Sequence, residues 1–131
     1  MENHRYKKAL LIDDNDIDNF INKKLLVKTK FAIDIVEKKS ANSALEYLKS
    51  TIDNPSDMPD IIFLDIMMPV MDGFDFLDEF DLLPEEIKNN CRIIMLSSTE
   101  SFKDLNRANS NKYVYKFLNK PLTEMVLAAI Q

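Results

Sequence analysis

Acidic, hydroxyl and basic side chains stand at the ends of four short strand-like segments of this 131-residue chain. The first segment, residues 9–12, is continuous and apolar, as expected for a central strand in a parallel sheet. The carboxyl ends of such strands meet at one edge of the sheet, where ligands bind in open α/β folds. We therefore expect one crevice lined by Asp13, Asp14, Asp65, Ser97 and Lys120.

Three carboxylates in one crevice repel one another, and each raises the pKa of the others unless a cation binds among them. Magnesium suits such a site because it takes one or two carboxylates, waters and phosphate oxygens as ligands. Asp14 and Asp65 fit that role, and Lys120 and Ser97 can each hold a phosphoryl oxygen. We expect Asp65 to take and lose a phosphoryl group beside such an ion, and no separate base is needed because a carboxylate is already a nucleophile at neutral pH.

Strand-like and helix-like segments alternate along the sequence, which is typical of an α/β fold with helices on both faces of a parallel sheet. The expected strands are residues 9–12, 31–36, 61–64, 93–96 and 114–118. The expected helices are residues 16–29, 41–48, 74–80 and 102–108, followed by a last helix capped by Thr123. Ser40 is a further expected cap, Asp72 and Asp75 form a capping arrangement for the third helix, and Pro84 stops that helix.

The composition is that of a globular protein, with 46% hydrophobic and 30% charged residues, and the length fits a single domain over residues 1–131. The net charge of -5 disfavours direct binding to nucleic acid. Cys91 is the only cysteine, which excludes an intramolecular disulfide, and it is expected to be half-buried. No apolar run approaches the roughly 20 residues that span a bilayer, so we expect a cytoplasmic protein without membrane contact.

The acidic residues after the first expected strand also resemble the start of an EF-hand calcium loop, with Asp14, Asp16 and Asp18 alternating. That loop requires Gly where Asn19 stands and a bidentate Glu where Leu25 stands, so we reject calcium binding of this type. Asp16 and Asp18 are interpreted instead as a solvated helix start, where carboxylates favour the positive end of the helix dipole.

Four motifs, each at an expected strand end, give the chain a resemblance to the receiver domains of bacterial two-component response regulators. They are LIDDN at residues 11–15, FLDIMMPVMDG at 63–73, IMLSS at 94–98, and Lys120-Pro121. The match covers nearly the whole chain and is similar to the stand-alone chemotaxis type. The resemblance implies a flavodoxin-like, doubly wound (βα)5 three-layer sandwich whose five-stranded parallel sheet has the order 2-1-3-4-5.

The resemblance implies that Asp65 is the phosphoacceptor, which takes its phosphoryl group from a phosphohistidine of a sensor histidine kinase or a phosphotransfer protein. It also implies that Asp13, Asp14 and Asp65, with the backbone carbonyl of Met67, hold Mg²⁺, for which Mn²⁺ can substitute. Such a domain works as a switch in a phosphorelay. It takes part in its own phosphotransfer and dephosphorylation and is not an enzyme with a separate substrate.

The resemblance further implies how the switch responds. Ser97 matches the family's switch Ser/Thr, Lys120 matches its lysine, and the bond from Lys120 to Pro121 is expected to be cis. Phe117 stands at the switch aromatic, whose rotamer couples to Ser97, but it lacks the hydroxyl of a tyrosine. The fourth helix, fifth strand and fifth helix are the expected output surface, for a downstream protein, an output domain or a second copy of the chain.

Two features before and within the last expected strand depart from the family pattern. Residues 109–112 contain no Gly where many receivers place one. Tyr113, Tyr115 and Phe117 recur with period two, which most simply marks one face of the strand. The helical pattern still runs at the end of the sequence, so a truncation before an output domain stays open.

Two rival functions remain. The first is a magnesium-dependent phosphatase that resembles haloacid dehalogenases, which need a second Asp two residues after the nucleophile as general acid. Met67 stands at that position, so this rival lacks its acid. The second is an inert module that resembles a receiver and only binds proteins, although every expected type of site residue is present.

Overall fold

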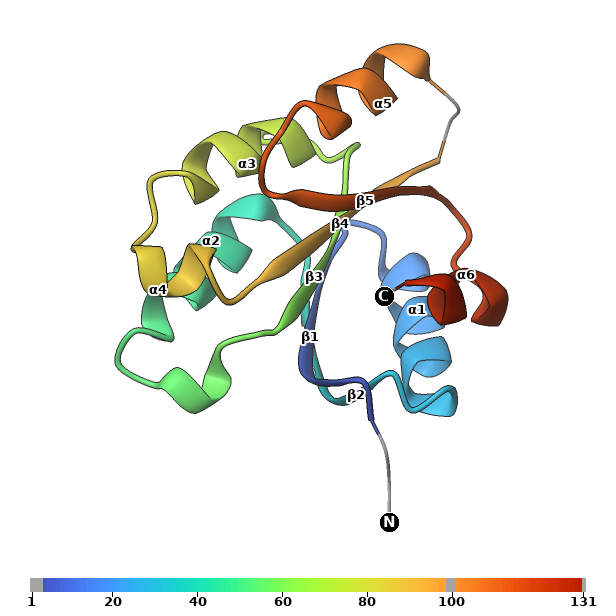
Figure 1. Cartoon of the computed structure of the whole chain (residues 1–131), viewed down its shortest axis with the longest axis horizontal. Helices are drawn as coiled ribbons and strands as arrows, with labels where there is room; N and C mark the ends of the chain where they lie inside the picture. Colours follow the sequence, from blue (N-terminus) through green and yellow to red (C-terminus); the bar gives the residue numbers. More distant parts are fainter. Residues whose placement is uncertain (1–3, 99–100, 131) are drawn as a thin grey trace.

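The computed structural model describes residues 4–98 and 101–130. Five strands form one parallel sheet in the order β2-β1-β3-β4-β5 (Figure 1). They are β1 (Tyr6–Ile12), β2 (Ala32–Lys38), β3 (Ile61–Asp65), β4 (Arg92–Ser97) and β5 (Val114–Asn119). The predicted fold class and strand order are therefore confirmed. Within the two described ranges, no helix is long and apolar enough to cross a membrane.

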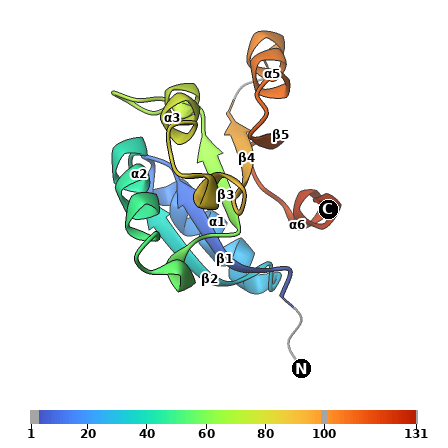
Figure 2. The ribbon, with the colours of Figure 1, turned by 60° about the vertical axis from the view of Figure 1, so that its left-hand side comes forward.

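Helices cover both faces of this sheet, as Figures 1 and 2 show from two directions. Helices α1 and α6 lie on one face, and α2, α3 and α5 lie on the other. The bounds are α1 (Asp16–Lys28), α2 (Ala41–Ser50), η1 (Pro55–Asp57, a 3-10 turn), α3 (Gly73–Phe80), α4 (Glu85–Lys88), α5 (Phe102–Asn109) and α6 (Glu124–Ala129). The result is a three-layer sandwich.

The central strands are apolar throughout because each faces two cores. In β1, Leu10 and Ile12 pack into the core under α2 and α3, whereas Ala9 and Leu11 pack into the core under α1 and α6. All four side chains are at most 1% exposed. A continuous apolar run is thus the sequence signature of a strand buried on both faces.

The predicted helix caps are confirmed. Ser40 accepts a hydrogen bond from the backbone three residues on, and Thr123 does the same for α6. Asp72 and Asp75 form a reciprocal capping box at the start of α3. Asn15 caps α1 through its side-chain oxygen, which fixes the turn directly after β1.

The short helix α4 and the turn η1 were not expected. Helix α4 begins directly after Pro84 and is anchored by Ile87, which is fully buried. Four residues with one buried apolar side chain give no helical period that a sequence pattern can show. Because of α4, the fourth and fifth helices expected from the sequence are α5 and α6.

Two local expectations need correction. Tyr113 and Phe117 pack against the same core cluster, but Tyr115 is 37% exposed and lies under the Arg92 guanidinium, 4.5 Å from it. A register shift between β4 and β5 interrupts the alternation that the period-two pattern assumed. Cys91 is buried rather than half-buried, its thiol donates to the Pro59 carbonyl at 3.0 Å, and burial raises its pKa to about 12.

Candidate functional site

The side chains expected in one crevice all lie at or just beyond the carboxyl ends of strands. Asp65 and Ser97 are the last residues of β3 and β4. Asp13 comes directly after β1, and Lys120 comes directly after β5. The structure therefore brings residues more than 100 positions apart in the sequence to one edge of the sheet.

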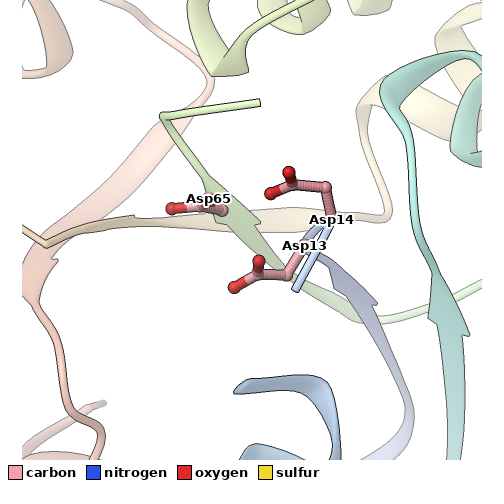
Figure 3. Close-up of side chains that lie close together, drawn as sticks. All are labelled: Asp13, Asp14 and Asp65. Carbon is pink, nitrogen blue, oxygen red and sulfur yellow. The ribbon is translucent and has the colours of Figure 1, made fainter. Parts of the chain in front are cut away.

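Three carboxylates form the centre of this site (Figure 3). One oxygen each of Asp13, Asp14 and Asp65 lies within 4.8 Å of the others. Asp13 and Asp65 are buried, whereas Asp14 is exposed at the mouth of the site. Clustered carboxylate oxygens that are partly open to water are the donor set that Mg²⁺ and Mn²⁺ prefer.

Asp65 is the most perturbed carboxylate. Its side chain is 5% exposed, and burial, with the nearby charge of Asp13, raises its pKa from 3.8 to about 6 against the opposing effect of Lys120. Oδ1 of Asp65 accepts no hydrogen bond from the described residues. A buried oxygen without a hydrogen-bond donor destabilises the folded chain. This oxygen is therefore suited to contact a ligand that binds at the site.

Lys120 is the cation of the site. Its Nζ donates to Asp13 Oδ2 at 2.7 Å and to Asp18 Oδ2 at 2.9 Å, and it lies 3.2 Å from Asp65 Oδ1. Burial by itself would lower the pKa of Lys120, but the hydrogen bonds to Asp13 and Asp18 raise it above the ordinary value. The ammonium is therefore held charged beside the phosphoacceptor candidate.

Asp18 was missed by the sequence reasoning. The interpretation as a solvated helix start holds for Asp16, whose side chain is 70% exposed and pairs with Lys39. It is wrong for Asp18, which reaches Lys120 from the first turn of α1. The position of Asp18 was the available signal, because a helix that starts only four residues after the end of β1 must place part of its first turn at the crevice.

Asp13 is fixed by neighbours from the same turn. Its Oδ1 accepts a hydrogen bond from the Asn15 backbone at 2.9 Å, and its backbone carbonyl accepts one from the Asn19 side chain at 2.8 Å. With Lys120 on Oδ2, both carboxylate oxygens are engaged. Asp13 is thus oriented before any ligand binds.

Ser97 and Lys120 are joined through the backbone. The Lys120 amide donates to the Ser97 carbonyl at 2.8 Å, so the residue after β5 is hydrogen-bonded to the end of β4. The Ser97 side chain is buried, and the bond between Lys120 and Pro121 is cis. Phe117, three residues before Lys120, is half-buried and borders a pocket with Phe102 of α5.

The only glycine of the chain holds the loop after β3 close to the site. The Gly73 amide donates to the Ile66 carbonyl at 2.8 Å. A Cβ added at Gly73 would come within 2.9 Å of both the Asp65 carbonyl oxygen and the Ile66 Cα. This close approach of α3 to the end of β3 requires a residue without a side chain.

The Met67 side chain is 66% exposed and lies in the loop after β3. No carboxylate occupies this position, two residues after Asp65, where the rival phosphatase would need its general acid. The contribution of the Met67 backbone carbonyl to a metal site stays a prediction.

Comparison with known proteins agrees with this geometry. The sequence matches the family described as "Response regulator receiver domain" over residues 9–130. The crystal structure of a two-component response regulator from Cytophaga hutchinsonii superposes with a TM-score of 0.90 and 31% identity, covering 97% of this chain and 95% of that one. A response regulator receiver protein from Dyadobacter fermentans gives a TM-score of 0.82 and 32% identity, covering 92% and 91%.

A curated relative from Methanothrix harundinacea, the probable methanogenesis regulatory protein FilR2, is 27% identical over 114 residues. The match covers 87% of this chain and 72% of that protein.

Proposed function

Since this chain belongs to the response regulator receiver domain family, we propose that Asp65 accepts a phosphoryl group from a phosphohistidine and thereby switches the surface of α5, β5 and α6. The family's members are phosphoacceptor switches rather than enzymes with a separate substrate. The observation that carries the proposal is Asp65 itself, a buried carboxylate with a lysine ammonium 3.2 Å away and one oxygen to which none of the described residues donates a hydrogen bond.

The transfer needs no separate base. An Asp65 oxygen forms a bond to phosphorus while the bond from phosphorus to the histidine nitrogen of the donor breaks. The imidazole nitrogen keeps the electron pair of that bond and is neutral after protonation by solvent. Positioning and charge neutralisation then supply the catalysis, which is the pattern of phosphoryl transfer in general.

Lys120 supplies the fixed positive charge. Its Nζ is already beside Asp65, so it can contact a phosphoryl oxygen without a large movement. Ser97 lies at the neighbouring strand end, and its hydroxyl is the donor proposed for a second phosphoryl oxygen. These two contacts would pull on the ends of β4 and β5 together because the two backbones are hydrogen-bonded there.

Asp13, Asp14 and Asp65 are the residues proposed to hold a divalent ion, with the Met67 carbonyl as a further ligand. Their carboxylate oxygens are of the hard type that suits Mg²⁺ and Mn²⁺, and one oxygen of each residue lies within 4.8 Å of the others. When bound, such an ion neutralises charge on the phosphoryl oxygens during transfer. Asp14 is exposed, so an ion held there would be open to water and to the donor's phosphate.

The proposed output surface is the one that contains Phe117. This side chain is half-buried between the core and α5, so a movement of Ser97 and Lys120 can change its packing. Phe102 of α5 is exposed and borders the same pocket as Phe117, and Met125 of α6 is exposed as well. A downstream protein, an output domain or a second copy of the chain would read this surface, and a histidine kinase or phosphotransfer protein would load Asp65.

The test is incubation of the chain with magnesium and a small phosphodonor such as acetyl phosphate, followed by mass spectrometry of the intact protein. We expect a gain of one phosphoryl group that disappears in Asp65→Asn and after chelation of the metal. Sustained hydrolysis of unrelated phosphomonoesters would support the phosphatase instead. If the mass of the protein does not change, the result would support the rival module that only binds proteins.

A further inference from the structure

The Lys120 ammonium is shared between the phosphoacceptor site and the first turn of α1. An ammonium has three N–H donors. One is used by Asp13 at 2.7 Å and a second by Asp18 at 2.9 Å. Asp65 Oδ1 accepts none, although Nζ lies only 3.2 Å away. The direction of the ammonium is therefore set in part by a residue of α1.

We propose that Asp18 is a positioning residue that competes with the phosphoryl group for Lys120. The inference rests on the proposed function of Asp65. In the unphosphorylated chain, Asp18 draws one N–H of Lys120 towards α1 and leaves Asp65 Oδ1 free of a hydrogen bond. A phosphoryl group on Asp65 recruits Lys120 at the expense of this contact, so Asp18 opposes the phosphorylated state.

The two partners of Lys120 differ in their access to water. The Asp13 side chain is 4% exposed, so it cannot release the ammonium without another cation in its place. The Asp18 side chain is 38% exposed and can be solvated when Lys120 leaves it. Its backbone is fixed because the Asp18 amide donates to the capping Asn15 side chain at 3.0 Å. The backbone of Asp18 is thus held in place, while the contact between its side chain and Lys120 can still be broken.

The negative charge of Asp18 opposes a phosphoryl group on Asp65, as its contact with Lys120 does. A phosphoryl group adds up to two negative charges at Asp65. The Asp18 carboxylate shares a cation with that site, so it stands close enough to repel the added charge. Removing Asp18 therefore frees Lys120 and removes repulsion, and both effects favour a bound phosphoryl group.

Asp16 provides a matched control. It lies in the same first turn of α1 and also pairs with a lysine, since its Oδ1 is 2.7 Å from Lys39 Nζ. Asp16→Asn and Asp18→Asn remove the same formal charge from the same helix start. Only the second removes a contact with Lys120.

The test measures binding of beryllofluoride, a non-covalent mimic of a phosphoryl group, in the presence of magnesium by amide NMR titration. We expect Asp18→Asn to lower the half-saturating concentration about two- to five-fold, the range for a partly exposed ion pair. Asp16→Asn should leave it at the wild-type value. Asp18→Glu, which keeps the charge and can still reach Lys120, should restore the wild-type value.

A second measurement follows the Lys120 contact without metal or mimic. The ¹⁵N resonance of Lys120 Nζ should shift in Asp18→Asn and not in Asp16→Asn, and Asp18→Ser serves as a further variant should Asp18→Asn fail to fold. Equal affinities in the two Asn variants, or weaker binding in Asp18→Asn than in wild type, would overturn the inference. Failure of the wild-type chain to bind the mimic would overturn the proposed function and this inference with it.

Discussion

Lys120 Nζ lies 3.2 Å from Asp65 Oδ1, yet that oxygen accepts no hydrogen bond from residues 4–98 and 101–130. The pair is an ion pair without the directed bond that would tie the carboxylate down. Asp65 therefore remains available as a nucleophile, while burial and the charge of Asp13 keep its pKa near 6 instead of 3.8. The same feature that suits the site for chemistry is expected to destabilise the fold.

The first prediction concerns stability against pH. Between about pH 4 and pH 6 the unfolded chain ionises at Asp65 while the folded chain still binds the proton, so the free energy of unfolding falls as pH rises through this window. A pKa shift of about two units lowers the free energy of unfolding by at most about 3 kcal/mol across this window. Asp65→Asn should therefore be more stable than wild type at pH 7, and the difference should shrink towards pH 4.

Denaturant unfolding in metal-free buffer at a series of pH values checks this prediction. Only the difference between wild type and Asp65→Asn is used, because other groups titrate in both proteins. Added magnesium should reduce the difference, since a cation among the carboxylates offsets their repulsion. A difference that does not change with pH would mean that Asp65 is ionised equally easily in both states.

The second prediction concerns Lys120. Lys120→Ala should keep the fold, because the side chain lies at the edge of the sheet and outside both apolar cores. It should weaken the response to phosphorylation, measured as amide chemical-shift changes in α5, β5 and α6. Lys116→Ala, within β5 and exposed, is the control and should respond as wild type does. Equal responses in the two variants would count against a role for Lys120.

The strands and the site residues at their ends could be predicted because one physical rule governs both. A strand such as β1 or β3 is buried on two faces, so it shows as a short apolar run with an abrupt polar end. Parallel pairing then brings those ends to one edge without further information. Asp13, Asp65 and Lys120 could therefore be assigned to one crevice from the order of the runs alone.

The contact of Asp18 with Lys120 could not be predicted in this way. It joins residues 102 positions apart, and it depends on the rotation of α1 about its axis. Local spacing reports only that Asp18 is polar and close to a helix start, which fits a solvated residue equally well. The register shift in β5 is similar, because the pairing partner that creates it lies in another strand.

The third prediction concerns Gly73. A Cβ in Gly73→Ala would lie 2.9 Å from two backbone atoms at the end of β3, and backbone cannot move aside as a side-chain tip can. We expect a loss of about 1–3 kcal/mol in the free energy of unfolding, as for overpacking in a core. Phosphorylation by a small donor should fall as well, because Asp65 shares the displaced backbone.

Asp72→Ala separates these two effects. It removes the capping side chain of α3 and should cost about 1 kcal/mol of stability, without touching the Asp65 backbone. Its rate of phosphorylation, measured under conditions where it stays folded, should match wild type. The interpretation of Gly73 is wrong if Gly73→Ala loses stability but phosphorylates at the wild-type rate.

The fourth prediction distinguishes acceptance of the phosphoryl group from the response to it. Ser97→Ala keeps Asp65, the carboxylates and the backbone bond between Ser97 and Lys120, and it removes only the hydroxyl. Mass spectrometry should therefore still detect phosphorylation, whereas the chemical-shift changes in α5, β5 and α6 should be reduced. Ser98→Ala, at the next and exposed position, should retain both. A full response in Ser97→Ala would count against the Ser97 hydroxyl and favour Lys120 as the origin of the switch, since the backbone bond between the two residues is kept in this variant.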